Sequence, residues 1–258
     1  MNATTGSAAH ALRVRGVTRR FGGLVAVRGV DLDVAPGERR VVLGPNGAGK
    51  STLFNLVAGD LRVSEGTVEV GGTDVTALGA HRRARLGVAR TYQRSTLFGN
   101  LDVADNLRMA LLAARGARLG LLRRTVRALD ADVRGLAEQV GLADELGVPA
   151  GTLSHGRQRQ LELGIALAGS PRLLLLDEPA AGLSPAERTL LAGLLAGLPR
   201  DITVVLIEHD MDVALPFADV VTVMHDGVVV EEGDADHVAA SAVVHEIYLG
   251  TAAGSTHA

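Results

Sequence analysis

Apolar and polar residues alternate along the first part of the chain. Between residues 12 and 34 most apolar side chains stand at alternate positions, and the dipeptide Pro36-Gly37 separates them from an uninterrupted apolar run, 41–43. Alternation is typical of strands with one buried face, whereas a short continuous run indicates a strand covered on both faces. Glycine-rich sequence follows this run and leads into an apolar-periodic segment that ends at Gly59. We therefore expect antiparallel strands, then a buried strand, a loop and a helix.

The period of the pattern changes twice further along the chain. Short β segments, with a Gly-Gly hairpin turn at 71–72, continue to about residue 93, and from about 102 to 168 the apolar residues recur at helical spacing. Strands and helices then alternate again: RLLLLDEP and ITVVLIEHD predict buried strands, a helix begins at Pro185, and the Asp-Gly pair at 226–227 predicts a hairpin. No repeat of about 20 to 50 residues is present, so the chain is one unit and not a tandem pair.

Composition narrows the classes of protein. The 258 residues are 47% hydrophobic and 21% charged, which suits one large folded domain, or one domain with an inserted lobe, and excludes a disordered chain. The net charge of -3 gives no basic field for nucleic acid, and the absence of cysteine fits a reducing compartment such as the cytosol. No apolar run approaches the roughly 18 residues of a membrane helix, and the N-terminus lacks the apolar core of a secretion signal. We expect any membrane role to be peripheral.

A glycine-rich loop contains the only lysine of the chain. All but one of the 26 basic residues are arginine, and the exception is Lys50. The segment GPNGAGKS matches G-x-x-x-x-G-K-[ST] between a predicted buried strand and a helix, which is the context of a phosphate-binding P-loop. Its glycines let backbone N–H groups approach phosphate oxygens, and the helix N-terminus adds a positive dipole end.

This loop predicts how a nucleotide would be bound. Lys50 would reach the β and γ phosphates, and the Ser51 hydroxyl would ligate a Mg²⁺ that bridges them. The alternative is a glycine-rich connection in some other α/β protein. We expect the nucleotide-binding residues of this segment to be Gly44, Pro45, Asn46, Gly47, Ala48, Gly49, Lys50, Ser51 and Thr52.

Two predicted buried strands end in residues suited to catalysis. The apolar run 173–176 is followed by Asp177 and Glu178, and the run 204–207 leads to His209. The carboxyl ends of parallel strands open on the crevice where such folds bind ligands. We expect Asp177 to hold Mg²⁺ through its water shell, Glu178 to orient or deprotonate the attacking water, and His209 to contact the γ-phosphate or that water. Solvated strand-end acids and a polar strand terminus are the alternatives.

A serine-glycine segment completes a recognisable series of motifs. Between the helical lobe and the acid-tipped strand lies LSHGRQ, which contains Ser154 and Gly156. The order GPNGAGKS, Gln93, LSHGRQ, LLLLDEP and His209 resembles the nucleotide-binding subunit of an ATP-binding cassette (ABC) transporter. The resemblance covers nearly the whole chain, from Phe21 to residue 233, and LSHGR stands where the family has LSGGQ.

This resemblance, added to the strand pattern, implies an α/β fold. The expected architecture is a P-loop NTPase core with a mainly parallel sheet, an antiparallel β subdomain and an inserted helical subdomain. Within a single ABC ATPase domain spanning 1–258, the RecA-like core with its antiparallel part would comprise 1–93 and 169–240. The helical subdomain would comprise 94–168, and a C-terminal helix and tail 241–258. The small, polar end of the tail, 251–258, predicts no fixed structure.

The resemblance also implies a site shared between two subunits. Each ATP would lie between the P-loop of one subunit and Ser154 and Gly156 of the other, in a head-to-tail dimer. ATP would therefore favour the closed dimer, and hydrolysis would remove that preference. In the family, the residue at Gln93 senses both Mg²⁺ and the transmembrane partner, and the residue at Phe21 stacks on adenine. A buried core position is the alternative for Phe21.

Some residues depart from the family pattern. His155 and Arg157 replace a glycine and a glutamine of the commonest signature, and Ser184 stands where many cassettes have aspartate. Because Ser154, Gly156, Glu178 and His209 remain, we predict active hydrolysis of ATP.

Three segments resemble a particular subfamily, the ATP-binding subunits of importers for branched-chain amino acids: DEPAAGLSP, LIEHDM and the ending IYLG. Importers of urea, amides or other amino acids are the alternatives. The implied partners are transmembrane permease subunits, a second ABC ATPase subunit of the same or a related kind, and indirectly an extracytoplasmic solute-binding protein, at the cytoplasmic face of the membrane. We expect no nucleic acid partner. The competing functions are an export-type ABC ATPase, an ABC ATPase without a transport role, and a nucleotide-binding module without catalysis.

The Arg-rich segment 115–127 would face the membrane or the partner subunits, or it would be a solvated helix face.

Overall fold

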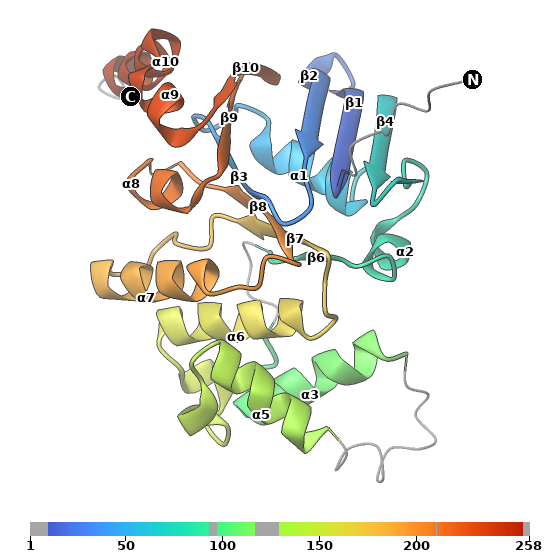
Figure 1. The fold of residues 1–258 in the computed structure, drawn as a ribbon, viewed down its shortest axis with the longest axis vertical. Coiled ribbons are helices and arrows are strands. Elements are labelled where there is room, and N and C mark those ends of the chain that lie inside the picture. The colour runs from blue at the N-terminus through green and yellow to red at the C-terminus, as the bar shows by residue number, and fades with distance from the viewer. Residues whose placement is uncertain (1–9, 93–96, 117–128, 210, 255–258) are drawn as a thin grey trace, which may run out of the picture.

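The fold is built around two β-sheets, and the larger one forms the centre of the molecule. The computed structural model describes residues 10–92, 97–116, 129–209 and 211–254. The strand order of the larger sheet is β10-β9-β3-β8-β7-β6 (Figure 1), with β10 antiparallel to β9 and the other neighbours parallel. The bounds of these strands are β3 Arg39–Leu43, β6 Val88–Arg90, β7 Leu173–Asp177, β8 Thr203–Ile207, β9 Val220–His225 and β10 Val228–Gly233.

The smaller sheet is antiparallel, with the order β2-β1-β4-β5. Its strands are β1 Leu12–Phe21, β2 Leu24–Val34, β4 Glu65–Val70 and β5 Thr73–Asp74. The hairpin turn predicted at Gly71 and Gly72 joins β4 to β5, and both glycines have positive φ angles, 54° and 77°. Glycine suits this turn because it adopts such angles at little steric cost.

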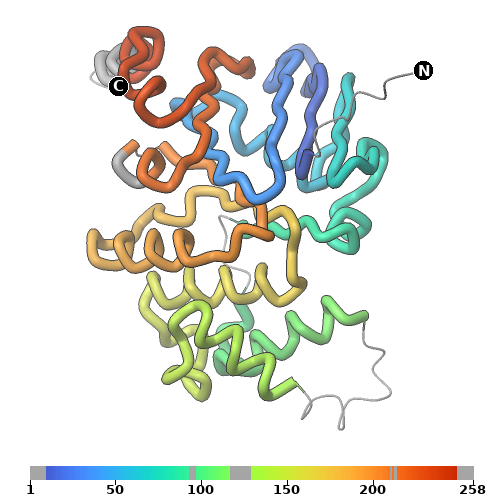
Figure 2. The backbone as a smooth tube through the Cα atoms, viewed as in Figure 1, coloured from blue at the N-terminus to red at the C-terminus, as the bar shows by residue number. Residues whose placement is uncertain are grey.

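The helices cover the larger sheet on both faces. Their bounds are α1 Lys50–Ala58, α2 Ala80–Ala84, α3 Val103–Ala114, α5 Asp130–Gln139, α6 His155–Leu167, α7 Pro185–Ala196, α8 Met211–Ala214, α9 Ala235–Ala240 and α10 Ala242–Gly254, with 3₁₀ turns η2 Ala143–Glu145, η3 Ala150–Thr152 and η4 Leu215–Phe217. Helices α3, α5 and α6 pack on one another. In Figure 2 the backbone leaves the sheet after β6, passes through these three helices and returns at β7.

The larger sheet separates two hydrophobic cores, which explains why its strands are continuously apolar. Leu173 and Leu175 of β7 belong to the core shared with α1 and the antiparallel sheet, whereas Leu174 and Leu176 belong to the core shared with α6 and α7. All four side chains are at most 1% exposed. Side chains alternate across a strand, so burial of both faces requires an apolar residue at every position.

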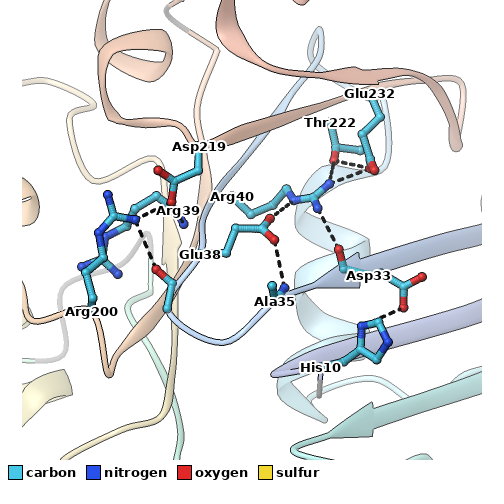
Figure 3. A network of polar contacts seen from close by, with 11 residues as sticks. His10, Asp33, Ala35, Glu38, Arg39, Arg40, Arg200, Asp219, Thr222 and Glu232 are labelled. Carbon is cyan, nitrogen blue, oxygen red and sulfur yellow. Dashed lines mark hydrogen bonds and ion pairs between the residues drawn. The ribbon is translucent and has the colours of Figure 1, made fainter. Parts of the chain in front are cut away.

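Two buried arginines open the central strand β3, and the alternation of the sequence gave no sign of their burial. Arg40 donates to the backbone oxygen of Asp33 at the end of β2, 2.7 Å, and to Thr222 Oγ1 of β9, 2.8 Å, and it forms an ion pair with Glu232 of β10, 2.6 Å (Figure 3). The Arg39 guanidinium donates to backbone carbonyls in the segment before β8. These contacts connect the antiparallel sheet to the larger sheet and satisfy the buried charges.

The C-terminal segment differs from the expectation. Helix α10 continues to Gly254, so for residues 251–254 the expected lack of fixed structure is wrong, and residues 255–258 lie outside the described part. Ala252 and Ala253 explain the difference, because alanine has the highest helix propensity and extending an existing helix needs no new nucleus. Over the residues that the structure describes, no helix combines the length and the apolar character needed to span a bilayer.

Candidate functional site

The P-loop occupies the turn between β3 and α1. Gly49 caps α1 with a φ of 98°, and a Cβ added there would lie 2.5 Å from the backbone oxygen of Ala26. Glycine is therefore required by close packing as well as by conformation. The loop borders a pocket of about 270 Å³, lined by residues 46–52, Ala26 and Glu178. Backbone donors of the loop and the N-terminus of α1 make this pocket suitable for an anionic phosphate group.

Lys50 is buried beneath the loop and does not face bulk water. Its side chain is 5% exposed, and Nζ donates to the backbone oxygens of Gly44, 2.6 Å, and Pro45, 3.0 Å. Burial lowers the pKa of Lys50, while the nearby carboxylates of Glu178 and Asp177 act in the opposite direction. The ammonium group therefore lies against the loop backbone, and Lys50 is one of the residues that line the pocket.

Asp177 ends β7 with one oxygen paired and the other without a partner. Its side chain is 2% exposed, and Oδ2 lies 3.0 Å from an Arg90 nitrogen. Oδ1 has no hydrogen-bond partner within the described residues. Burial raises the pKa of Asp177, and the charge of Arg90 acts against that shift. An unpaired carboxylate oxygen suits Mg²⁺, which binds oxygen ligands and takes the rest of its shell from water and phosphates.

Glu178 and His209 meet at the same edge of the sheet. Glu178 has a left-handed φ of 47°, and its N–H donates to the Ile207 oxygen of β8, 3.0 Å. Such a backbone costs about 1–3 kcal/mol and is typical of functional positions. His209 Nδ1 lies 3.7 Å from Glu178 Oε1. The strand order explains this proximity, because β8 lies between β3 and β7 and delivers the histidine between the P-loop and the acid pair.

Ser154 and Gly156 begin α6, away from the chain's own P-loop pocket. Ser154 is the N-cap of α6, and its hydroxyl donates to Glu187 Oε1, 3.3 Å, while the Gly156 N–H donates to the same oxygen, 3.0 Å. Neither residue lines the pocket around Lys50. Two donors directed at one carboxylate oxygen show that this segment can bind an anion.

Two of the three departures from the family signature, Arg157 and Ser184, have local structural roles. Ser184 caps α7 in a capping box with Glu187, and Arg157 donates to the Gly141 oxygen, 2.7 Å, and lies 3.2 Å from Glu145. Hydrogen bonds of this kind stabilise helix ends.

The structure describes Phe21 but not Gln93, the two residues whose roles were expected from the family resemblance. Phe21 is 42% exposed at the end of β1, so the alternative of a buried core position is wrong, and the Arg19 guanidinium lies 4.5 Å from its ring centroid. Stacking of Phe21 on adenine stays a prediction. Gln93 lies outside the described residues, as does most of the Arg-rich segment 115–127.

A groove separates the larger sheet from the helices inserted after β6. It has a volume of about 570 Å³, and its walls come from α2, β6, α3 and α6, with Arg90 and Tyr92 among the lining residues. Several other lining residues are alanines and glycines, including Ala110, Ala113 and Gly169, which leave room for an inserted side chain or helix.

The sequence analysis did not predict three residues that contact the site. Arg90 contacts Asp177, Glu187 contacts the Ser154 loop, and Glu208 is 1% exposed with Oε1 accepting from the Ala180 N–H, 3.3 Å. Burial raises the pKa of Glu208. Only Glu187 carried a sequence signal, because S-x-x-E before an apolar run is the pattern of a capping box.

The strand order, the P-loop and the strand-end acids define a P-loop nucleotide hydrolase. The family model described as ABC transporter matches residues 27–181, more than half of the chain. The chain belongs to the ABC transporter family and is an ATPase of that type.

Relatives and solved structures agree with this assignment. The chain is 37% identical over 250 residues to the high-affinity branched-chain amino acid transport ATP-binding protein BraF of Pseudomonas aeruginosa, covering 93% of this chain and 98% of that protein. It is also 37% identical to LivG of Escherichia coli K12, named for the same transport, over 251 residues and with the same coverage. The crystal structure of an ATP-binding cassette of an ABC transporter in its ADP conformation matches with a TM-score of 0.82 at 28% identity, covering 93% of this chain and 99% of that one. The predicted fold class and the resemblance are confirmed.

Proposed function

We propose that the chain is the ATP-hydrolysing subunit of an importer for branched-chain amino acids, peripheral to the cytoplasmic face of the membrane. The names of the two relatives support the class of solute, because both are ATP-binding proteins of branched-chain amino acid transport. The observation that carries the catalytic part is that Lys50 and Glu178 line one pocket, with the Asp177 charge acting on Lys50 and His209 lying 3.7 Å from Glu178.

The P-loop binds the phosphates of ATP in this proposal. Backbone N–H groups of residues 46–52 and the Lys50 ammonium balance the triphosphate charge, and Phe21 stacks on adenine. Ser51, Asp177 and Gln93 hold Mg²⁺, which, when bound, offsets charge on the phosphates as the terminal bond breaks. The unpaired Oδ1 of Asp177 supports this assignment.

Glu178 acts as the base toward the attacking water, and His209 contacts the γ-phosphate or that water. A positioned base is typically worth about 10²–10⁴ in rate. Glu178 lines the pocket beside the loop, and the 3.7 Å separation from His209 lets both side chains reach one water.

The site is completed by a second ATPase subunit, the same chain or a related one, facing head to tail. Ser154 and Gly156 of one subunit then bind the γ-phosphate held by the P-loop of the other. Their absence from the lining of the chain's own pocket and their shared contact with a carboxylate support this arrangement. ATP bridges the two subunits, so its hydrolysis loosens their interface and moves the attached permeases.

The permease subunits dock in the groove between the larger sheet and helices α3 and α6. Its small side chains and its position beside the segment that leads to Gln93 support this placement. The extracytoplasmic solute-binding protein would act only through the permeases.

Uptake measurements in cells test the proposal. Deletion of the gene is expected to abolish uptake of labelled leucine, isoleucine and valine, and the wild-type gene is expected to restore it. Glu178→Gln should not restore uptake, whereas Glu246→Gln, at an exposed position on α10, should. Loss of urea uptake alone would overturn the class of solute, and unchanged uptake of all solutes would overturn the role in import.

A further inference from the structure

Arg90 connects three elements around the Asp177 carboxylate. It ends β6, and its side chain is 8% exposed. Its guanidinium lies 3.0 Å from Asp177 Oδ2 at the end of β7 and 2.9 Å from Asp60 Oδ2 just after α1, and it also donates to Asn55 Oδ1 within α1. A planar fork of this kind fixes the geometry of its carboxylate partners more tightly than a point charge does.

The same side chain borders the groove. Arg90 and Tyr92 both line it, and the guanidinium lies 5.0 Å from the centroid of the Tyr92 ring. Tyr92 is 44% exposed, so a partner in the groove has access to its ring. One guanidinium thus lies between the groove wall and the strand-end acid.

Another buried arginine close to Arg90, on α2, has different partners. Arg83, 1% exposed, directs its guanidinium at backbone carbonyls, including those of Leu56 and Val57, both about 2.6–2.7 Å away. Arg83 therefore stabilises the end of a helix. Arg90 instead holds one oxygen of Asp177 and leaves the other oxygen, Oδ1, without a partner in the described residues.

We propose that Arg90 is a positioning residue for Asp177: it fixes Oδ2 so that Oδ1 points to the metal position, and it links that orientation to the groove, which Arg90 itself and Tyr92 line. This inference rests on the proposed role of Asp177 toward Mg²⁺. Outer partners of ligating carboxylates orient them, and their loss typically weakens metal binding by about 10- to 100-fold.

Binding of a fluorescent ATP analogue, titrated with Mg²⁺ or measured in EDTA, separates positioning from folding. Arg90→Lys and Arg90→Gln are expected to raise the Mg²⁺ midpoint about 10- to 100-fold. Binding in EDTA should stay within about threefold of wild type, because the P-loop is unchanged. The matched control is Arg83→Lys, which should lower the melting temperature but leave the Mg²⁺ midpoint unchanged. Equal midpoints for Arg90→Lys, Arg90→Gln and wild type would overturn the proposal.

Asp60→Asn tests whether Arg90 acts directly on Asp177. This change keeps the pair between Arg90 and Asp177 and weakens the partly exposed one, so the Mg²⁺ midpoint should move by no more than about threefold. A shift as large as that of Arg90→Lys would show that Asp60 mediates the effect and would overturn direct positioning. If wild-type protein bound the analogue without any dependence on Mg²⁺, the proposed metal role of Asp177 would fail first, which distinguishes the two failures.

Discussion

Replacing Gly49 of the P-loop by alanine is expected to lower the free energy of unfolding for two separate reasons, its backbone angle and its close packing. With φ at 98°, any other residue is in a conformation that costs about 1–2 kcal/mol. An alanine Cβ would also lie 2.5 Å from the Ala26 oxygen and 3.3 Å from Gly227 Cα, both backbone atoms that cannot rotate away. Overpacking against such atoms adds about 1–3 kcal/mol. Gly49→Ala should therefore destabilise the protein by about 2–5 kcal/mol.

Gly47 provides a matched control within the same loop. Its φ of 84° is similar, but a Cβ added there would meet no atom within 4 Å. Gly47→Ala should therefore cost only the conformational part, about 1–2 kcal/mol. Urea denaturation without nucleotide measures both variants, and each additional kcal/mol should also lower the melting temperature by roughly 2–4 °C. Equal destabilisation of the two variants would refute the assignment of Gly49 to close packing.

Three further changes test other parts of the structure. The raised pKa of buried Glu208 means that its ionised form opposes folding, so this residue contributes a loss of stability as pH rises from about 4.5 through its folded pKa. In urea denaturation at a series of pH values, Glu208→Gln should therefore lose less stability over this range than the wild type. A wild-type slope in the variant would contradict this. His209→Gln should lower kcat of ATP hydrolysis by about 10²–10³ with the Kd for ATP nearly unchanged, and an unaltered kcat would contradict the contact with the reacting groups. Gly156→Ala should be more destabilising in the wild type than in Glu187→Ala, because the added Cβ would lie 2.5 Å from Glu187 Oε1; equal melting-temperature shifts in the two backgrounds would refute this.

Much of the fold followed from the sequence because burial and turn chemistry are local. The apolar runs before Gly44 and Asp177 predicted strands buried on both faces, and both strands lie inside the larger sheet. The adjacency of His209 to the acid pair also followed, since consecutive strands of such a sheet are usually neighbours. The full order did not follow, because β8 also pairs with β3, from a distant part of the sequence.

The polar contacts of the site were not predictable in the same way. Arg90 is one of many arginines, and only the pairing of β6 with β7 brings it to Asp177. Arg39 and Arg40 come just before the apolar run of β3, where charged side chains are usually expected to be exposed. Their burial depends on partners far along the chain. Long-range pairs of this kind leave no periodic signal.

ATP binding and hydrolysis by the purified chain, measured beside Lys50→Ala and Glu178→Gln, test the central claim most directly. The wild type should bind and hydrolyse ATP, Glu178→Gln should bind ATP without hydrolysis, and Lys50→Ala should do neither. Turnover by the wild type no higher than that of Glu178→Gln, or wild-type affinity in Lys50→Ala, would contradict the claim that these residues form an ATPase site.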